Sequence, residues 1–119
     1  IGFGGIAGHC FVQQKRDATG YCHRIICAQD YSAVTAACMM VKKTVFFEVG
    51  KFEPEYAVAF NDVDLCMRIR QKGYLIVFTP YAELYHYESK SRKADDTPEK
   101  RARFVGEVGK RTRSGRSIL

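Results

Sequence analysis

Residues 59–74, AFNDVDLCMRIRQKGY, are the stretch that most constrains the fold. Asn61 is a good helix N-cap and Gly73 is a good residue to follow a helix end, so we expect a helix between them. At about 100° per residue, positions 62, 65, 66 and 69 of this helix share one face. Three of these positions hold apolar residues, Leu65, Cys66 and Ile69. That face is therefore predicted to pack inward.

The fourth residue on the inward face is an acid, Asp62. A carboxylate that faces inward needs a partner, a metal ion or a substrate cleft. Asp64 is expected to point the other way, beside Arg68 one turn later, where it can reach back to Asn61 and pair with the arginine. Stabilisation of the helix N-terminus is an alternative for both acids and suits Asp64 better. Asp62 is the stronger candidate for a functional role.

The rest of the chain alternates between strand and helix patterns. Residues 33–41 (AVTAACMMV) are predicted to form a buried strand, or a strand and turn that enter the sheet, and residues 74–78 (YLIVF) a buried strand. Both runs are predicted to be buried on both faces. Residues 42–50 predict a short helix ended by Gly50, with an inward face formed by Val45, Phe46 and Val49. An extended segment at 83–89 and a final helix at 96–104, with Thr97 as N-cap, complete the order. This order predicts an α/β sheet protein with fewer strands than a doubly wound domain has.

Length and composition narrow the class of protein. A chain of 119 residues forms one domain at most, and a hydrophobic fraction of 46% is enough for a core. No apolar run approaches the roughly 18–20 residues that span a bilayer. The chain begins at Ile1 in a Gly-rich apolar stretch rather than at Met, which we expect of a piece cut from a longer protein.

The excess of positive charge lies in the last quarter of the sequence. Residues 90–119 hold ten basic and four acidic side chains, whereas residues 1–89 hold nine of each. Such a tail can bind nucleic acid or an anionic membrane surface. Because Phe104 is its one aromatic residue, a solvated or membrane-surface segment is favoured over nucleic-acid binding.

Five cysteines, an odd number without a C-x-x-C pair, favour reduced thiols and a cytoplasmic protein. A zinc site is the alternative, although the spacing fits no standard pattern. Its ligands would come from His9, Cys10, Cys22, His23 and Cys27.

His86 lies in the Tyr-rich run YHYES, where a packed histidine is common, and a functional role for His86 is expected only if it meets Asp62 in space.

Several spaced blocks resemble glycosyltransferase family 2. They are TAACMMVKKTVFFEVGKF, NDVDLCMRIRQKGYLIVFTP and the histidine that follows, over roughly residues 30–105. The continuation TPEKRARF is similar to bacterial members that act in O-antigen and related surface-polysaccharide synthesis. The resemblance implies the C-terminal, acceptor-side half of a GT-A fold, which is Rossmann-like, in residues 1–105, followed by a basic tail at 106–119.

The resemblance also implies an activity, namely transfer of a sugar from a nucleotide-sugar to a saccharide or lipid-linked acceptor with inversion. Asp62 matches the catalytic base, which takes the proton of the acceptor hydroxyl. His86 matches a histidine that helps hold a divalent metal, Mg²⁺ or Mn²⁺, or the diphosphate leaving group. Contact with substrate is implied for Thr35, Ala36, Asn61 and Asp64. The expected place is cytoplasmic or peripheral to the inner membrane.

Three departures from the family pattern qualify these expectations. No D-x-D segment precedes residue 62, Lys51 stands where a second glycine is usual, and Asn61 replaces the usual Glu. We therefore expect the donor-binding half to be missing, the chain alone to be inactive and to hold no metal, and its bare sheet to pair as a homodimer. The alternative is a stand-alone sugar-binding or assembly module without catalysis.

Overall fold

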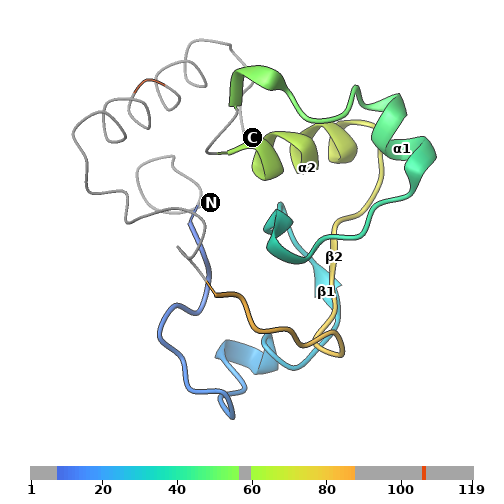
Figure 1. Ribbon diagram of the computed structural model, residues 1–119. Coiled ribbons are helices and arrows are strands. Elements are labelled where there is room, and N and C mark those ends of the chain that lie inside the picture. The colour runs from blue at the N-terminus through green and yellow to red at the C-terminus, as the bar shows by residue number, and fades with distance from the viewer. Residues whose placement is uncertain (1–7, 57–59, 88–105, 107–119) are drawn as a thin grey trace.

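The computed structural model describes residues 8–56, 60–87 and 106. Two short strands, β1 (Gln29–Asp30) and β2 (Val77–Phe78), pair antiparallel, with Gln29 opposite Phe78. The α-helices are α1 (Lys43–Glu48) and α2 (Asn61–Gln71). The 3-10 helices are η1 (Tyr21–His23), η2 (Ala36–Cys38) and η3 (Pro54–Tyr56). In Figure 1, α2 lies beside α1, and the two strands run below them.

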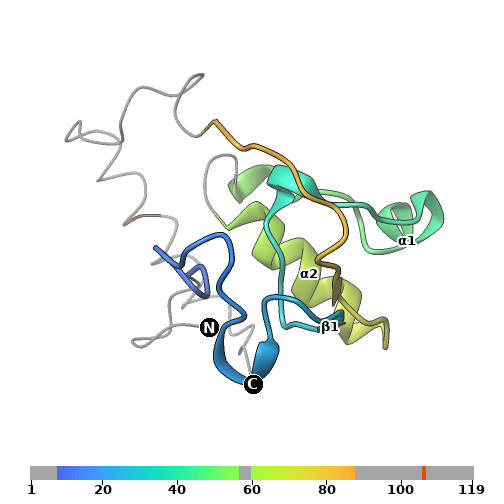
Figure 2. The ribbon, with the colours of Figure 1, turned by 90° about the horizontal axis from the view of Figure 1, so that it is seen from below.

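The core forms between the two α-helices and the residue that leads into β2. Leu65 and Cys66 of α2 are fully enclosed, and Ile69 lies one turn later on the same face. Val45 and Val49 of α1 pack against them, joined by Ile76. The predicted inward faces of both helices are thus confirmed. Figure 2 shows β1 next to the C-terminal half of α2, where Arg70 donates to Asp30 of β1.

Both α-helices end at the glycines that the sequence singled out. Gly50 and Gly73 each have a φ of +86°, a left-handed conformation that costs glycine little. After α2, Gly73 N donates to Arg70 O at 2.8 Å and Tyr74 N donates to Ile69 O at 3.4 Å. The same pair of bonds follows α1. These are Schellman motifs, which satisfy carbonyls that the helix leaves unpaired.

The start of α2 differs from the prediction by one residue. The helix begins at Asn61, and its N-cap is Phe60, with φ 62° and ψ 4°. A bulky side chain in this left-handed region is an outlier, and such outliers cluster at functional sites. The chain is therefore held in an unusual conformation directly before Asn61 and Asp62.

The strand predicted at 33–41 is wrong. Residues 36–38 form η2, because the Thr35 hydroxyl accepts a bond from Ala37 N at 3.3 Å and caps a 3-10 turn. Val34, Met39 and Val41 still pack against the core, whereas Met40 is 99% exposed. The segment's apolar residues thus cover the core from a turn instead of entering a sheet.

Of the strand predicted at 74–78, only β2 (Val77–Phe78) forms, and the run is buried on one face only. Ile76 is buried, whereas Leu75 and Val77 are 69% and 58% exposed. Its partner, β1, was not predicted. Within the part of the chain that the structure describes, the sheet has two strands. The α/β class and the partial GT-A fold stay predictions.

Several predictions concern residues at the limits of the described ranges. Residues 83–87 are exposed and without regular structure. Three predictions lie outside the described residues: the helix at 96–104, the boundary at 105 and the basic tail apart from residue 106. Among residues 8–56, 60–87 and 106, no helix combines the length and apolar character needed to cross a membrane.

Candidate functional site

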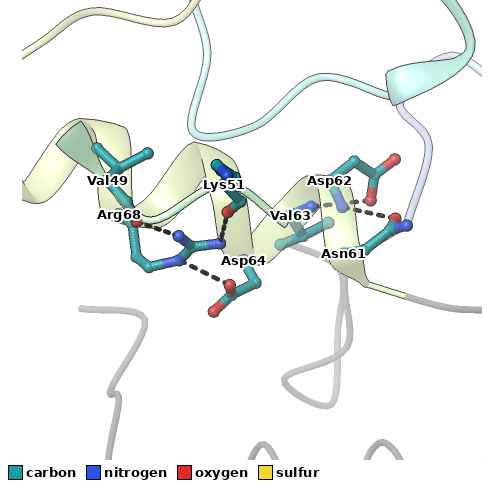
Figure 3. Close-up of polar contacts among 7 residues, drawn as sticks. All are labelled: Val49, Lys51, Asn61, Asp62, Val63, Asp64 and Arg68. Carbon is teal, nitrogen blue, oxygen red and sulfur yellow. Dashed lines mark hydrogen bonds and ion pairs between the residues drawn. The ribbon is translucent and has the colours of Figure 1, made fainter. Parts of the chain in front are cut away.

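Asp62 lies in the first turn of α2, half-buried, with both carboxylate oxygens engaged by backbone N–H groups. Its Oδ1 accepts from Val63 N at 2.8 Å, and its Oδ2 accepts from Ala36 N at 3.1 Å. Its own N–H donates to Asn61 Oδ1 at 2.7 Å. The Asn61 and Val63 contacts appear in Figure 3. The carboxylate plane is thus held from two elements, α2 and the start of η2.

A second contact ties the same two segments together one turn further along α2. Cys66 is 1% exposed, and its Sγ donates to Val34 O at 3.7 Å. Burial raises the pKa of the Cys66 thiol, and the nearby charge of Asp62 adds to this increase. Cys66 is therefore a protonated donor at neutral pH, and it fixes the segment that carries Ala36.

Asp64 lies on another side of α2 than Asp62, beside Arg68, as the helical period predicts, but it is buried there. It is 4% exposed, and its Oδ2 accepts from Arg68 Nε at 2.8 Å. The reason is tertiary: the chain that leaves α1 lies over this side of α2. Arg68 also donates to Val49 O and, at 2.7 Å, to Lys51 O. Figure 3 shows Arg68 between Asp64 and these two carbonyls, while Asp62 points elsewhere.

The pairing of Asp64 with Arg68 at i,i+4 is confirmed, but the role of Arg68 at the end of α1 was missed. Gly50 signals that the last carbonyls of α1 need partners. No spacing in the sequence indicates which distant arginine supplies them. The same holds for Arg70, which donates to Asp30 across 40 residues of sequence.

The structure brings four of the six predicted site residues together. Asn61 and Asp62 meet Thr35 and Ala36 through the bond from Ala36 N to the Asp62 carboxylate. Asp64 lies on the side of α2 that faces the end of α1. His86 is exposed in the segment that follows β2. The cluster of four is the candidate site.

Metal binding finds little support in the described residues. They contain no group of three or more His, Cys, Asp or Glu side chains that could hold an ion. This contradicts the zinc alternative, because its five proposed ligands all lie within residues 8–56. His86 alone does not make a site, so the described residues do not by themselves fit a divalent metal.

Comparisons with known proteins find relatives that are much longer than this chain. The chain is 53% identical over 109 residues to the uncharacterized protein y4gI of Sinorhizobium fredii, covering 91% of this chain and 12% of that protein. It is 34% identical over 101 residues to the O-antigen biosynthesis protein RfbC of Myxococcus xanthus, covering 83% and 8%. Over 62 residues it is 34% identical to the N-acetylglucosaminyl-diphospho-decaprenol L-rhamnosyltransferase of Mycobacterium tuberculosis, covering 52% and 20%.

The chain resembles sugar-transferring proteins. Two of the three relatives have names that refer to O-antigen biosynthesis or to rhamnosyl transfer, in agreement with the resemblance drawn from the sequence. The chain spans between 8% and 20% of the length of these relatives. No protein-family model and no solved structure matches it.

Proposed function

We propose that the chain is the acceptor-side part of an inverting, metal-dependent glycosyltransferase similar to family 2 enzymes of the GT-A fold. The names of two relatives support sugar transfer in cell-surface polysaccharide synthesis. In this proposal a sugar moves from a nucleotide-sugar to a saccharide or lipid-linked acceptor. Nucleotide binding belongs to a part of the enzyme outside these 119 residues.

The observation that carries the proposal is the setting of Asp62. Each of its oxygens accepts one backbone N–H bond. A carboxylate oxygen has two acceptor positions, so each keeps one for a substrate hydroxyl. The residue is half-buried, beside the left-handed Phe60, and is therefore held in place yet reachable. These are the properties that a positioned general base needs.

In the proposed reaction, Asp62 takes the proton of the acceptor hydroxyl. The oxygen of that hydroxyl forms a bond to the anomeric carbon while the bond from this carbon to the diphosphate breaks, and the configuration inverts. A divalent ion would stabilise the charge on the diphosphate. Since the described residues do not form its site, His86 is at most one ligand and the other ligands come from elsewhere in the enzyme.

Asp62→Asn in the complete protein tests the proposal. The amide oxygen can still accept the helix N–H bond but cannot take a proton, so we expect turnover to fall by about 10²–10⁴-fold while nucleotide-sugar affinity is kept. The assay measures acceptor-dependent release of nucleoside diphosphate from a panel of UDP-, dTDP- and GDP-sugars. Asp17→Asn, an exposed acid in the N-terminal loop, is the control. Wild-type turnover by the Asp62 variant would overturn the assignment.

A sugar-binding or assembly module without catalysis is the second candidate. It is favoured by the apolar and aromatic side chains that follow β2, of which Tyr81 and Tyr85 are 87% and 82% exposed. The same assay separates the two functions. A module binds saccharide but releases no nucleoside diphosphate with any sugar of the panel, whether Asp62 is present or replaced.

A further inference from the structure

We propose that the backbone N–H of Ala36 positions the Asp62 carboxylate, so that the turn at residues 34–38 sets the direction in which this base accepts a proton. The inference rests on the proposed function, in which Asp62 is the base. It assigns to Ala36 a positioning role in place of the substrate contact that the family resemblance implies.

The first support is the geometry of the carboxylate. The bond from Val63 N comes from the residue next in the chain, so it fixes only one oxygen from within α2. The bond from Ala36 N, at 3.1 Å, comes from a segment 26 residues away and reaches the other oxygen. Two donors from different elements determine the carboxylate plane, which one donor alone leaves free to rotate.

The second support is that the segment carrying Ala36 is itself anchored. Cys66 Sγ donates to Val34 O, two residues before Ala36, from within the core. The Thr35 hydroxyl accepts from Ala37 N and closes the turn after it. The N–H of Ala36 lies between these contacts, so its direction is determined on both sides. A donor held in this way keeps its place when a substrate hydroxyl arrives.

Ala36→Pro removes this one N–H with little other disturbance. Thr35 has φ −72° and ψ 143°, the conformation that a residue before proline prefers. Residue 36 is the first of η2, where proline is tolerated, and its side chain is exposed. The variant is therefore expected to fold, and it tests the hydrogen bond instead of the turn.

Two measurements test the inference. In the 119-residue chain, Asp62→Ala should speed hydrogen exchange of the exposed Ala36 amide about tenfold or more, because a bond to a charged acceptor is lost. In the complete enzyme, Ala36→Pro should lower kcat by about tenfold to 10²-fold and change KM for the nucleotide-sugar by less than about twofold. Met40→Ala, at a 99% exposed position of the same segment, is the control for both measurements.

The possible outcomes separate this inference from the proposed function. Unchanged exchange of the Ala36 amide in Asp62→Ala overturns the positioning role, even if the Ala36→Pro protein does not fold. Wild-type kcat in a folded Ala36→Pro protein overturns it as well. Normal turnover by Asp62→Asn would instead remove the proposed base, whatever the amide of Ala36 does.

Discussion

Asp30 is the acid at which β1, α2 and β2 are joined. Arg70 Nη1 donates to both of its oxygens, at 2.8 and 2.9 Å, and also to Tyr31 O at 3.0 Å. Ile76 N, just before β2, donates to Asp30 Oδ1 at 3.1 Å. The hydrogen bond from Arg70 lowers the pKa of the Asp30 carboxyl below its ordinary value of 3.8. A single exposed carboxylate thus ties the small sheet to the helix.

Asp30→Asn should make the free energy of unfolding less dependent on pH in the acid range. A carboxyl whose pKa is lower in the folded than in the unfolded state stabilises the fold at pH values above its unfolded-state pKa. This contribution is lost as the pH falls through the folded-state pKa. The variant should therefore be less stable than wild type at neutral pH, and the difference should shrink below a pH of about 3.8. Urea unfolding at a series of pH values measures it.

Asp17→Asn is the matched control for this experiment, because Asp17 is an exposed acid in a loop. It should change stability little at any pH. If the difference in unfolding free energy between wild type and Asp30→Asn stayed constant as the pH was lowered into the acid range, the role of the Arg70 contact would be contradicted.

At the scale of elements, the pair of Asp64 and Arg68 joins the two α-helices. Arg68 supplies N–H donors to Val49 O and Lys51 O at the end of α1, and Asp64 fixes the plane of its guanidinium group. The side chains of Arg68 and Asp64 are only 15% and 6% exposed. Lys51, which follows Gly50, adopts a left-handed φ of 64°. Its carbonyl bond to Arg68 helps to hold that conformation.

Asp64→Asn should cost about 1–3 kcal/mol of unfolding free energy, because a buried bond to a charged group is weakened. The i,i+4 spacing alone predicts only a few tenths of a kcal/mol. Glu48→Gln is the control, since Glu48 pairs with Lys72 at 3.8 Å with both side chains exposed, and should cost less than about 1 kcal/mol. Equal losses in the two variants, by chemical denaturation, would show that the burial of Asp64 adds nothing.

Gly73→Ala should destabilise the end of α2 by about 1–2 kcal/mol, because the φ of +86° is unfavourable for a residue with a Cβ atom. No atom lies within 4 Å of the added Cβ, so the loss would report the backbone alone. Gly73→Asn should recover part of it, since asparagine tolerates this region. Thermal unfolding measures both, with Gln71→Ala inside the helix as control. Full stability of Gly73→Ala would contradict the Schellman cap.

At the scale of the whole molecule, we expect the 119-residue chain to form a homodimer through the outer face of β2 and the segments directly before and after it. Leu75, Val77 and Leu84 are 69%, 58% and 72% exposed, which leaves apolar surface for a partner. In a two-fold symmetric dimer, the apolar patch of each copy is buried against the same patch of its partner. Sedimentation at several concentrations checks the prediction.

Leu75→Lys combined with Val77→Lys should convert the dimer to a monomer, because the charges make burial of this face unfavourable. Val12→Lys, which alters a 64% exposed valine of the N-terminal loop, should leave it unchanged. A wild-type chain that stays monomeric to high micromolar concentration would refute the dimer.

The sequence by itself determined the elements whose stabilising contacts lie within one or two turns. The apolar spacing of Leu65, Cys66 and Ile69 located the buried face of α2. The left-handed preference of Gly50 and Gly73 located both helix ends. Helix faces and C-terminal caps depend on neighbours three to five residues away, so they can be predicted from a short window.

Only the tertiary structure decided which acid is buried, which segments form the sheet and what lies beside Asp62. Asp64 is enclosed because the end of α1 folds over α2, and the segment that carries Ala36 is held to α2 by the bond from Cys66 Sγ to Val34 O. The bond from Ala36 N to Asp62 and the pairing of β1 with β2 join residues 26 or more positions apart. Such contacts form only when the connecting loops close, and the entropy of loop closure depends on the whole chain and not on a local pattern.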